Sequence, residues 1–323
     1  MSESTPPHRV ADQAAGENIC TAVVFEYSQT GQLTESVDAL VAPLITSGWR
    51  VRRIAVEPVR PFPFPWPVPR FFGVFPACVD EDATVDLATP VSELHSKPGE
   101  LVILAYQVWY LAPSLPIRTL LNRHRDIFAE REVLTLVVCR DKWYSAAVEV
   151  HRRLTEMGAR IAGAVAAIDT RAHALTLVST LRWLLFGKRD GSWFGRAGVG
   201  PEELSRLAEL GERIAEQKSA DEIAAVLRDN DSAPVMPVLA AADLMAGKMF
   251  RRWGGGIRRA SLIGAPARVA MLMAFVIWLG IAIIAGLPVL ALARLIGGER
   301  FDRAVRARVA VALGQTSVIG ART

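Results

Sequence analysis

The stretch from residue 27 to residue 34 has the composition of a phosphate-binding turn. It separates an apolar run from an amphipathic stretch and reads Tyr27-Ser28-Gln29-Thr30-Gly31-Gln32-Leu33-Thr34. Hydroxyl side chains around a glycine, between a strand and a helix N-terminus, offer O–H and N–H donors to a phosphate, and the helix dipole adds to the attraction. The spacing matches neither the G-x-x-x-x-G-K-[ST] loop nor the G-x-G-x-x-G turn. An ordinary capping turn is the alternative interpretation.

Two further segments combine aromatic and polar residues directly after apolar runs. They read Tyr106-Gln107-Val108-Trp109-Tyr110-Leu111-Ala112-Pro113 and Arg140-Asp141-Lys142-Trp143-Tyr144. Aromatic rings beside backbone N–H groups suit a planar ring with a polar edge, which they can stack on and hydrogen-bond. Candidate proton acceptors within them are Tyr106, Tyr110, Asp141 and Tyr144, and the sequence does not choose among these. The aromatic residues can instead simply fill the edge of a sheet.

Metal and disulfide chemistry find no support in the sequence. Cys20, Cys78 and Cys139 are widely spaced and form no C-x-x-C pair, which fits a reducing, cytosolic setting. The histidines are scattered, and we expect each to be a surface or helix residue. We therefore expect no metal site.

Short apolar runs alternate with amphipathic stretches, which predicts an α/β domain with a five-stranded parallel sheet. The expected strands are 21–27, 51–56, 101–105, 133–139 and 161–168, and the expected helices are 33–47, 115–122, 145–157 and 201–217. The last helix would close the second face of the sheet. The three chemically suggestive segments then follow the first, third and fourth strands, so they meet at one carboxyl edge beside the topological switch point.

Residues 58–76 hold prolines at 58, 61, 63, 65, 67, 69 and 76, which predicts extended chain where a helix would normally connect two strands. The aromatic residues there suggest either a lid for an apolar substrate or a cover for the sheet. A second insertion, 171–200, includes Leu181-Arg182-Trp183-Leu184-Leu185-Phe186, typical of an amphipathic patch.

The C-terminal third has the character of a membrane segment. Residues 269–293 form a 25-residue uncharged stretch, which as a helix would measure about 37 Å. A long core helix is the alternative, and Gly286 and Pro288 leave a kinked span or a shallow hairpin open. The window 248–308 carries a net charge of +9 within a chain of +4 overall, so the remainder sums to −5. Anionic lipid is thus the expected counter-charge, and nucleic acid is not an expected partner.

We divide the chain into five parts. They are a disordered N-terminus (1–18), the α/β domain (19–218, with insertions at 58–77 and 171–200), a flexible connector (219–264), a transmembrane or membrane-embedded segment (265–296) and a basic tail (297–323). The N-terminus lacks a secretory signal, which places the domain on the cytoplasmic face of the membrane.

The turn at 28–33 resembles the flavodoxin phosphate loop, Ser/Thr-x-Thr-Gly-x-Thr, which holds the phosphate of FMN. Leu33 stands where that pattern ends in a hydroxyl residue, and Thr34 comes one place later. The run from Tyr106 to the helix bearing Leu120 is similar to the flavin loop of flavodoxin-like quinone and FMN reductases. The resemblance implies a flavodoxin-like fold, FMN as cofactor, and a dimer as an expectation from that family. It implies cofactor contacts from Ser28, Gln29, Thr30, Gly31, Gln32, Leu33, Tyr106, Gln107, Val108, Trp109, Arg140 and Trp143.

Over roughly residues 20–190 the chain also resembles the bacterial dialkylresorcinol condensing enzymes, through the phosphate turn, Phe62-Pro63-Phe64-Pro65-Trp66 with Phe71-Phe72, and Ala105-Tyr106-Gln107-Val108-Trp109. This resemblance implies a role in aromatic lipid synthesis beside a ketosynthase. No condensing chemistry is readable here, since Cys139 has no visible partner. FMN suits oxidation of a cyclohexanedione to a resorcinol, with Tyr106, Tyr110 or Asp141 as base. The alternatives are an NAD(P)H-dependent quinone or FMN reductase and a non-catalytic membrane scaffold.

Overall fold

The computed structural model describes residues 20–190, 193 and 195–310. The expected disordered N-terminus and the end of the basic tail lie outside these residues. The strands are β1 (Thr21–Glu26), β2 (Arg50–Ala55), β3 (Leu101–Trp109), β4 (Ala112–Pro113), β5 (Glu132–Cys139) and β6 (Arg160–Ile168). The helices are α1 (Gln32–Thr46), α2 (Val68–Cys78), α3 (Leu115–Arg123), α4 (Tyr144–Glu156), α5 (His173–Phe186), α6 (Pro201–Ala215), α7 (Ala220–Asp229), α8 (Pro237–Ile263) and α9 (Ala265–Ala310), with a short 3-10 turn at Arg125–Ile127.

The sheet has the order β2-β1-β3-β5-β6, and every neighbouring pair along it is parallel. This is the doubly wound order of flavodoxin-like folds, and its switch point lies between β1 and β3. The expected fold class is confirmed. The sixth strand is the two-residue β4, which folds back antiparallel onto the end of β3 because the chain turns sharply at Tyr110 and Leu111.

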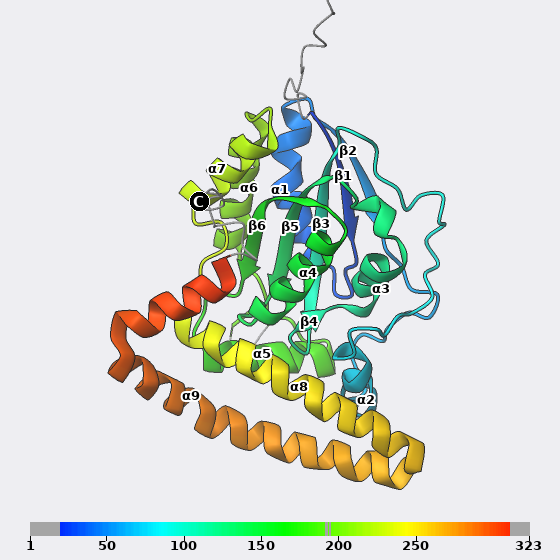
Figure 1. Ribbon diagram of the computed structural model, residues 1–323, viewed down its shortest axis with the longest axis vertical. Helices are drawn as coiled ribbons and strands as arrows, with labels where there is room; N and C mark the ends of the chain where they lie inside the picture. The colour runs from blue at the N-terminus through cyan, green and yellow to red at the C-terminus, as the bar shows by residue number, and fades with distance from the viewer. Residues whose placement is uncertain (1–19, 191–192, 194, 311–323) are drawn as a thin grey trace, which may run out of the picture.

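Helices cover both faces of the sheet (Figure 1). One core forms beneath α3 and α4, where Phe25, Leu104 and Val150 are fully or almost fully buried. The other forms beneath α1, α6 and α7, around Val37 and Leu207. Strands β1, β3 and β5 bury nearly every residue, as strands covered on both faces do, and this explains why their sequences are largely continuous apolar runs.

Helix α2 corrects the expectation that 58–76 is extended throughout. Residues 58–67 carry no regular helix, but Val68–Cys78 is helical with Pro67 as N-cap and Pro69 in the first turn. A proline in that turn sacrifices no intrahelical hydrogen bond, because the first N–H groups of a helix have no partner within it. Pro76 lies inside the helix, where its carbonyl accepts a bond from Arg258 of α8.

Helix α8 and the hydrogen bonds of Ser232 correct the flexible connector. Ser232 donates to the carbonyl of Ala164 in β6 and accepts the N–H of Ala166 through its own carbonyl, so the packed domain extends beyond residue 218. Helix α8 then runs unbroken through Gly254, where we expected flexibility. A Cβ at Gly254 would lie 2.2 Å from Val79 of α2, and one at Gly247 would lie 2.4 Å from Ser145 of α4. These glycines permit close packing.

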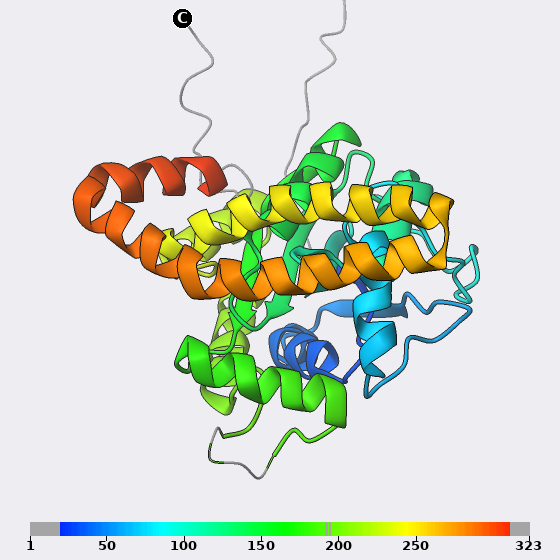
Figure 2. The same cartoon turned by 90° about the horizontal axis from the view of Figure 1, so that it is seen from below.

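Helix α9 packs along α8 and exposes most of its apolar surface. Among the described residues it is the one helix long and apolar enough to cross a membrane, and 6% of its most apolar window is buried. Gly298, at φ 50° and ψ −135°, kinks the helix after the apolar part. Seen from below, α2, α5, α8 and α9 lie across the end of the molecule to which the strand carboxyl ends point (Figures 1 and 2).

Candidate functional site

The turn after β1 lies at the switch point and leaves the start of α1 without a side-chain cap. Gly31, the N-cap residue, adopts φ 80°, and no side chain caps the helix. A Cβ added to Gly31 would meet nothing within 4 Å. Ser28 Oγ accepts a long bond of 3.4 Å from the N–H of Thr34. The first turn of α1 therefore offers N–H groups and a positive dipole end to an anion, as the phosphate interpretation requires.

The other predicted residues of this turn divide into two groups. Ser28 and Thr30 are half-buried, while the Leu33 side chain is 1% exposed in the core, so only its N–H can face a ligand. Gln29 is engaged elsewhere: its Nε2 donates to Pro63 O at 2.8 Å and its Oε1 accepts from Trp66 Nε1 at 3.2 Å. Gln29 thus ties the turn to the proline-rich segment.

The 171–200 insertion covers the start of α1. Arg189 forms a bidentate ion pair with Glu35, at 2.6 and 2.7 Å, and the hydrogen bonds from Arg189 lower the pKa of that carboxyl. A Cβ at Gly198, which adopts φ 93°, would come 1.9 Å from Gln32 Nε2. That amide nitrogen is buried and has no hydrogen-bond partner among the described residues. Gln32 therefore presents an unused donor beside the phosphate turn.

An aromatic cluster of Tyr27, Phe62, Trp66 and Trp109 fills the edge between β1 and β3. Phe62 and Trp109 meet edge to face at 4.8 Å, and Trp109 also contacts Tyr27 at 5.9 Å and Trp66 at 5.8 Å. Trp66 and Tyr27 are buried, and burial raises the pKa of the Tyr27 hydroxyl. The proline-rich segment thus covers the sheet edge with rings, the second of the two roles that its sequence allows.

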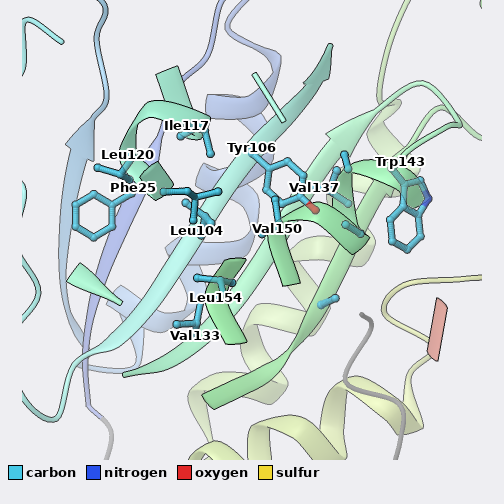
Figure 3. Close-up of a cluster of buried hydrophobic side chains, with 14 of the residues drawn as sticks. Phe25, Leu104, Tyr106, Ile117, Leu120, Val133, Val137, Trp143, Val150 and Leu154 are labelled. Carbon is cyan, nitrogen blue, oxygen red and sulfur yellow. The ribbon is translucent and has the colours of Figure 1, made fainter. Parts of the chain in front are cut away.

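The end of β3 does not place the Tyr106 side chain in a candidate site. Figure 3 shows its ring inside the core, near Leu104 and Val137, where it is 1% exposed. Burial raises the pKa of its hydroxyl far above the ordinary value. Tyr106 is therefore a core residue, and its predicted roles as base and cofactor ligand are withdrawn.

Tyr110 and its neighbours form a strained turn. Tyr110 and Leu111 adopt φ 51° and 65°, a left-handed pair that a two-residue hairpin loop normally fills with Asn or Gly. The Tyr110 hydroxyl donates to Phe71 O at 2.5 Å, and burial raises its pKa well above the ordinary value. This phenol positions α2, and it is not a free base. Val108 and Trp109 are half-buried, while Gln107 Nε2 is buried and unpartnered among the described residues.

The segment after β5 brings together Arg140, Asp141 and Trp143 as predicted. Asp141 is 2% exposed and pairs with Arg140 and Lys142, each at 3.0 Å. Trp143 is fully buried and its ring stacks on that of Tyr144 at 4.5 Å. Like Gln32 Nε2 and Gln107 Nε2, its Nε1 is a buried donor for which no described residue supplies an acceptor. The Tyr144 hydroxyl accepts from the Met236 N–H at 3.0 Å, which leaves it tied to the start of α8.

Asp243 of α8 is a residue that the sequence interpretation missed. Its carboxylate accepts the N–H groups of Tyr144, at 3.1 Å, and Ser145, at 2.9 Å, at the start of α4. Burial raises its pKa to about 6. The only signal in the sequence is a single acidic residue interrupting an apolar run. Because it lies almost a hundred residues away in the chain, spacing does not connect it to the segment it caps.

A small cavity lies on the other side of the β3–β4 turn. Val79, Leu111 and the buried pair Arg118 and Glu149 contribute to its lining. The guanidinium of Arg118 already binds Glu149 and the carbonyl oxygens of α2 and the residues after it, so this cavity belongs to the packing of α2.

No family model and no curated protein matches the sequence. A flavodoxin from the domain Archaea shares 13% identity at a TM-score of 0.35, covering 61% of this chain and 96% of its own. A protein from Bacteroides eggerthii DSM 20697, provisionally described as a flavoprotein, shares 13% at 0.37, covering 52% and 98%. A similarly described protein from Bacteroides uniformis ATCC 8492 shares 10% at 0.35, covering 52% and 99%. Because these scores are low, the fold assignment rests on the strand order.

Proposed function

We propose that this chain is a flavin-dependent oxidoreductase that holds FMN at the carboxyl edge of its sheet and acts on a hydrophobic ring beside a membrane. One observation carries the proposal. Gln32 Nε2, Gln107 Nε2 and Trp143 Nε1 are buried donors without a partner among the described residues, each in or beside one of the three segments that follow β1, β3 and β5. Buried donors normally have acceptors, so a set of three indicates a ligand rich in acceptors.

The residues present fit FMN in donor chemistry. Ser28, Thr30 and the first N–H groups of α1 would hold the phosphate, and Gln107 and Trp143 would donate to the ring edge. When bound, FMN supplies a two-electron acceptor. Of the four candidate bases, Asp141 alone remains, and its ion pairs with Arg140 and Lys142 fix where its carboxylate lies. Its role is to take a proton from the substrate carbon.

The resemblance to dialkylresorcinol enzymes supports a particular substrate class. Converting an alkylated cyclohexanedione to a resorcinol removes two hydrogens, one as a hydride and one as the proton that Asp141 accepts. Alkyl chains keep such a substrate in lipid, which suits a chain with an apolar helix such as α9. A ketosynthase that forms the ring is the proposed partner, and the cytoplasmic face is the proposed location.

A second candidate, a non-catalytic membrane scaffold, is favoured by the aromatic cluster. Phe62, Trp66 and Trp109 pack tightly where a flavin ring would need room. If that packing is permanent, the fold remains and the cofactor does not bind.

The visible absorption spectrum of the purified full chain separates the two candidates. Gly31→Val places a branched side chain where φ is 80° at the phosphate turn, and Gly48→Val does so where φ is 92° at the far end of α1. Backbone strain is therefore matched. We expect FMN in the wild type and in Gly48→Val, and its loss in Gly31→Val. A colourless wild type that FMN does not reconstitute contradicts the redox proposal and supports the scaffold.

A further inference from the structure

Helix α5 has its polar and apolar sides reversed relative to a helix on a water-exposed surface. Thr176 and Ser179 are buried, at 0% and 1% exposure. The outer side is apolar and carries Leu175 (42% exposed), Val178 (43%), Leu181 (36%) and Phe186 (65%). A helix between a protein core and water has the opposite arrangement. The outer side of α5 is therefore built for an apolar environment.

The helix is fixed firmly to the carboxyl end of the sheet. The carbonyl of Leu184 accepts the N–H of Trp66 at 2.7 Å, and the Trp183 ring, 5% exposed, contacts Phe64 edge to face at 5.9 Å. Arg171, just before the helix, donates to Ser179 Oγ at 3.2 Å and pairs with Asp169. Rotating α5 to hide its apolar side would break these contacts.

The apolar side of α5 lies at the same end of the molecule as α9. Figure 2 shows α2, α5, α8 and α9 together in the view from below. Arg268, at the start of α9, donates to Gly73 O of α2 at 3.1 Å. This bond links the pair of helices α8 and α9 to the proline-rich segment 58–76, which α5 also contacts. The surface of α9 at Met273, Ile277 and Ile284 is 57%, 62% and 78% exposed. Two apolar surfaces thus share one end.

The segments around this end are rich in basic residues, of which some pair with carboxylates, as Arg171 does with Asp169 and Arg189 with Glu35. Residues 171–200 contain five basic residues and one acidic residue, and residues 58–76 contain two basic residues and no acidic one. Residues 248–268, where α8 turns into α9, contain six basic residues and no acidic one. An apolar surface rimmed by Lys and Arg matches an anionic bilayer, whose headgroups attract the rim while the interior takes the apolar side chains.

We propose that the outer side of α5 is a second membrane contact, which together with α9 sets the carboxyl edge of the sheet against an anionic bilayer. A substrate dissolved in lipid then reaches that edge without crossing water. The contact follows from α5 and its surroundings, and it stands or falls independently of the flavin.

Fluorescent labels on the full chain test this contact. In a background in which the exposed Cys20 and the half-buried Cys139 are replaced by Ser, and in which Cys78 stays buried, a cysteine replaces Phe186 on α5, Met273 on α9 or Ile45 at the end of α1, all exposed positions. Ile45, 53% exposed, is the matched control because α1 ends at the opposite edge of the sheet. Each labelled protein is reconstituted into phosphatidylcholine vesicles with or without phosphatidylglycerol, and quenching by doxyl lipids and by aqueous iodide is measured.

We expect doxyl lipids to quench the labels at 186 and 273 and iodide to quench the label at 45. Phosphatidylglycerol should strengthen lipid quenching at 186, and Lys188→Gln with Arg196→Gln should remove that increase. Lipid quenching at 273 with iodide quenching at 186 would show that α9 alone meets the membrane and would overturn the proposal. Shielding of 186 in detergent that rises with protein concentration would assign α5 to a second copy and would overturn it too.

Discussion

Replacing Asp243 by Asn should change how stability depends on pH. The Asp243 side chain is fully buried in α8 and accepts the N–H groups of Tyr144 and Ser145 at the start of α4. Burial raises its pKa from 3.8 to about 6, although those N–H groups favour the charged form. Asn keeps the shape and one acceptor oxygen but does not titrate.

The direction and the size of the change in unfolding free energy with pH follow from the difference between the pKa of Asp243 in the folded and in the unfolded state. Because the folded pKa is the higher one, protonated Asp243 favours the folded state, and this contribution is complete below about pH 4 and lost as the pH rises through about 6. A shift of about two units at 1.36 kcal/mol per unit corresponds to about 3 kcal/mol. Relative to Asp243→Asn, the wild type should lose that much free energy of unfolding over this interval.

Urea unfolding of the full chain in detergent, followed by tryptophan fluorescence at a series of pH values, measures this difference. Asp82→Asn is the control, because Asp82 is exposed and its removal should leave the profile parallel to the wild type. A difference between wild type and Asp243→Asn that stays flat across the interval, or that grows in favour of the wild type with rising pH, would refute the reasoning.

Three other substitutions probe the packing around the site. Arg118→Met should lower the free energy of unfolding by up to about 3 kcal/mol, because it removes the bidentate partner of the buried Glu149 and leaves only the longer pair with Arg153, and adding Glu149→Leu should restore most of it in the same urea assay. Gly163→Ala, at φ 149° with its new Cβ 2.4 Å from a buried leucine methyl, should cost about 1–3 kcal/mol in thermal unfolding, and an unchanged melting temperature would contradict this. Glu35→Gln should speed tryptic cleavage after Arg189 while changing global stability by less than about 1 kcal/mol, because that pair is partly exposed.

The sheet and its flanking helices could be predicted because their signals are local. Most of the strands are largely apolar runs bounded by turn residues, and β1 and β5 match the expected ranges to within a residue. Strand β3 is longer than expected, since it continues through Tyr106 and Gln107, which pair with β5, to Val108 and Trp109, which pair with the antiparallel strand β4.

The wrong predictions of extended or flexible chain concern prolines and glycines, because both residue types also occur at particular positions of helices. Pro69 was expected to prevent a helix, yet it stands in the first turn of α2, where a missing N–H costs nothing. Gly254 was expected to mark flexible chain, yet it lies seven residues from Gly247 on one face of α8, which packs against α4 and α2. Their spacing, extended back to the buried Ala240, was the signal of a packed helix.

The candidate site was predictable by segment but not by residue. Chain order alone places three loops at one carboxyl edge, but it does not show that Gln29 points to Trp66 or that Tyr110 donates to Phe71. These contacts join residues that lie far apart in the chain and depend on how the proline-rich segment folds back. The assignment of Tyr106 to the site was wrong for another reason. Tyr106 lies within β3, and the alternation of side chains along that strand turns its ring into the core.

The close packing of α8 against α4 also has a mechanical consequence. Gly247 and Asp243 contact the same turn of α4, the turn that follows the Trp143 segment. A membrane helix attached through a flexible linker would let the domain rotate freely, but α8 packs directly on α4 and so holds α9 in a defined orientation to the sheet. If a thicker or more curved bilayer tilted α9, α8 would transmit that movement to the start of α4. The segment around Trp143, which is proposed to hold the flavin ring, would then be displaced first.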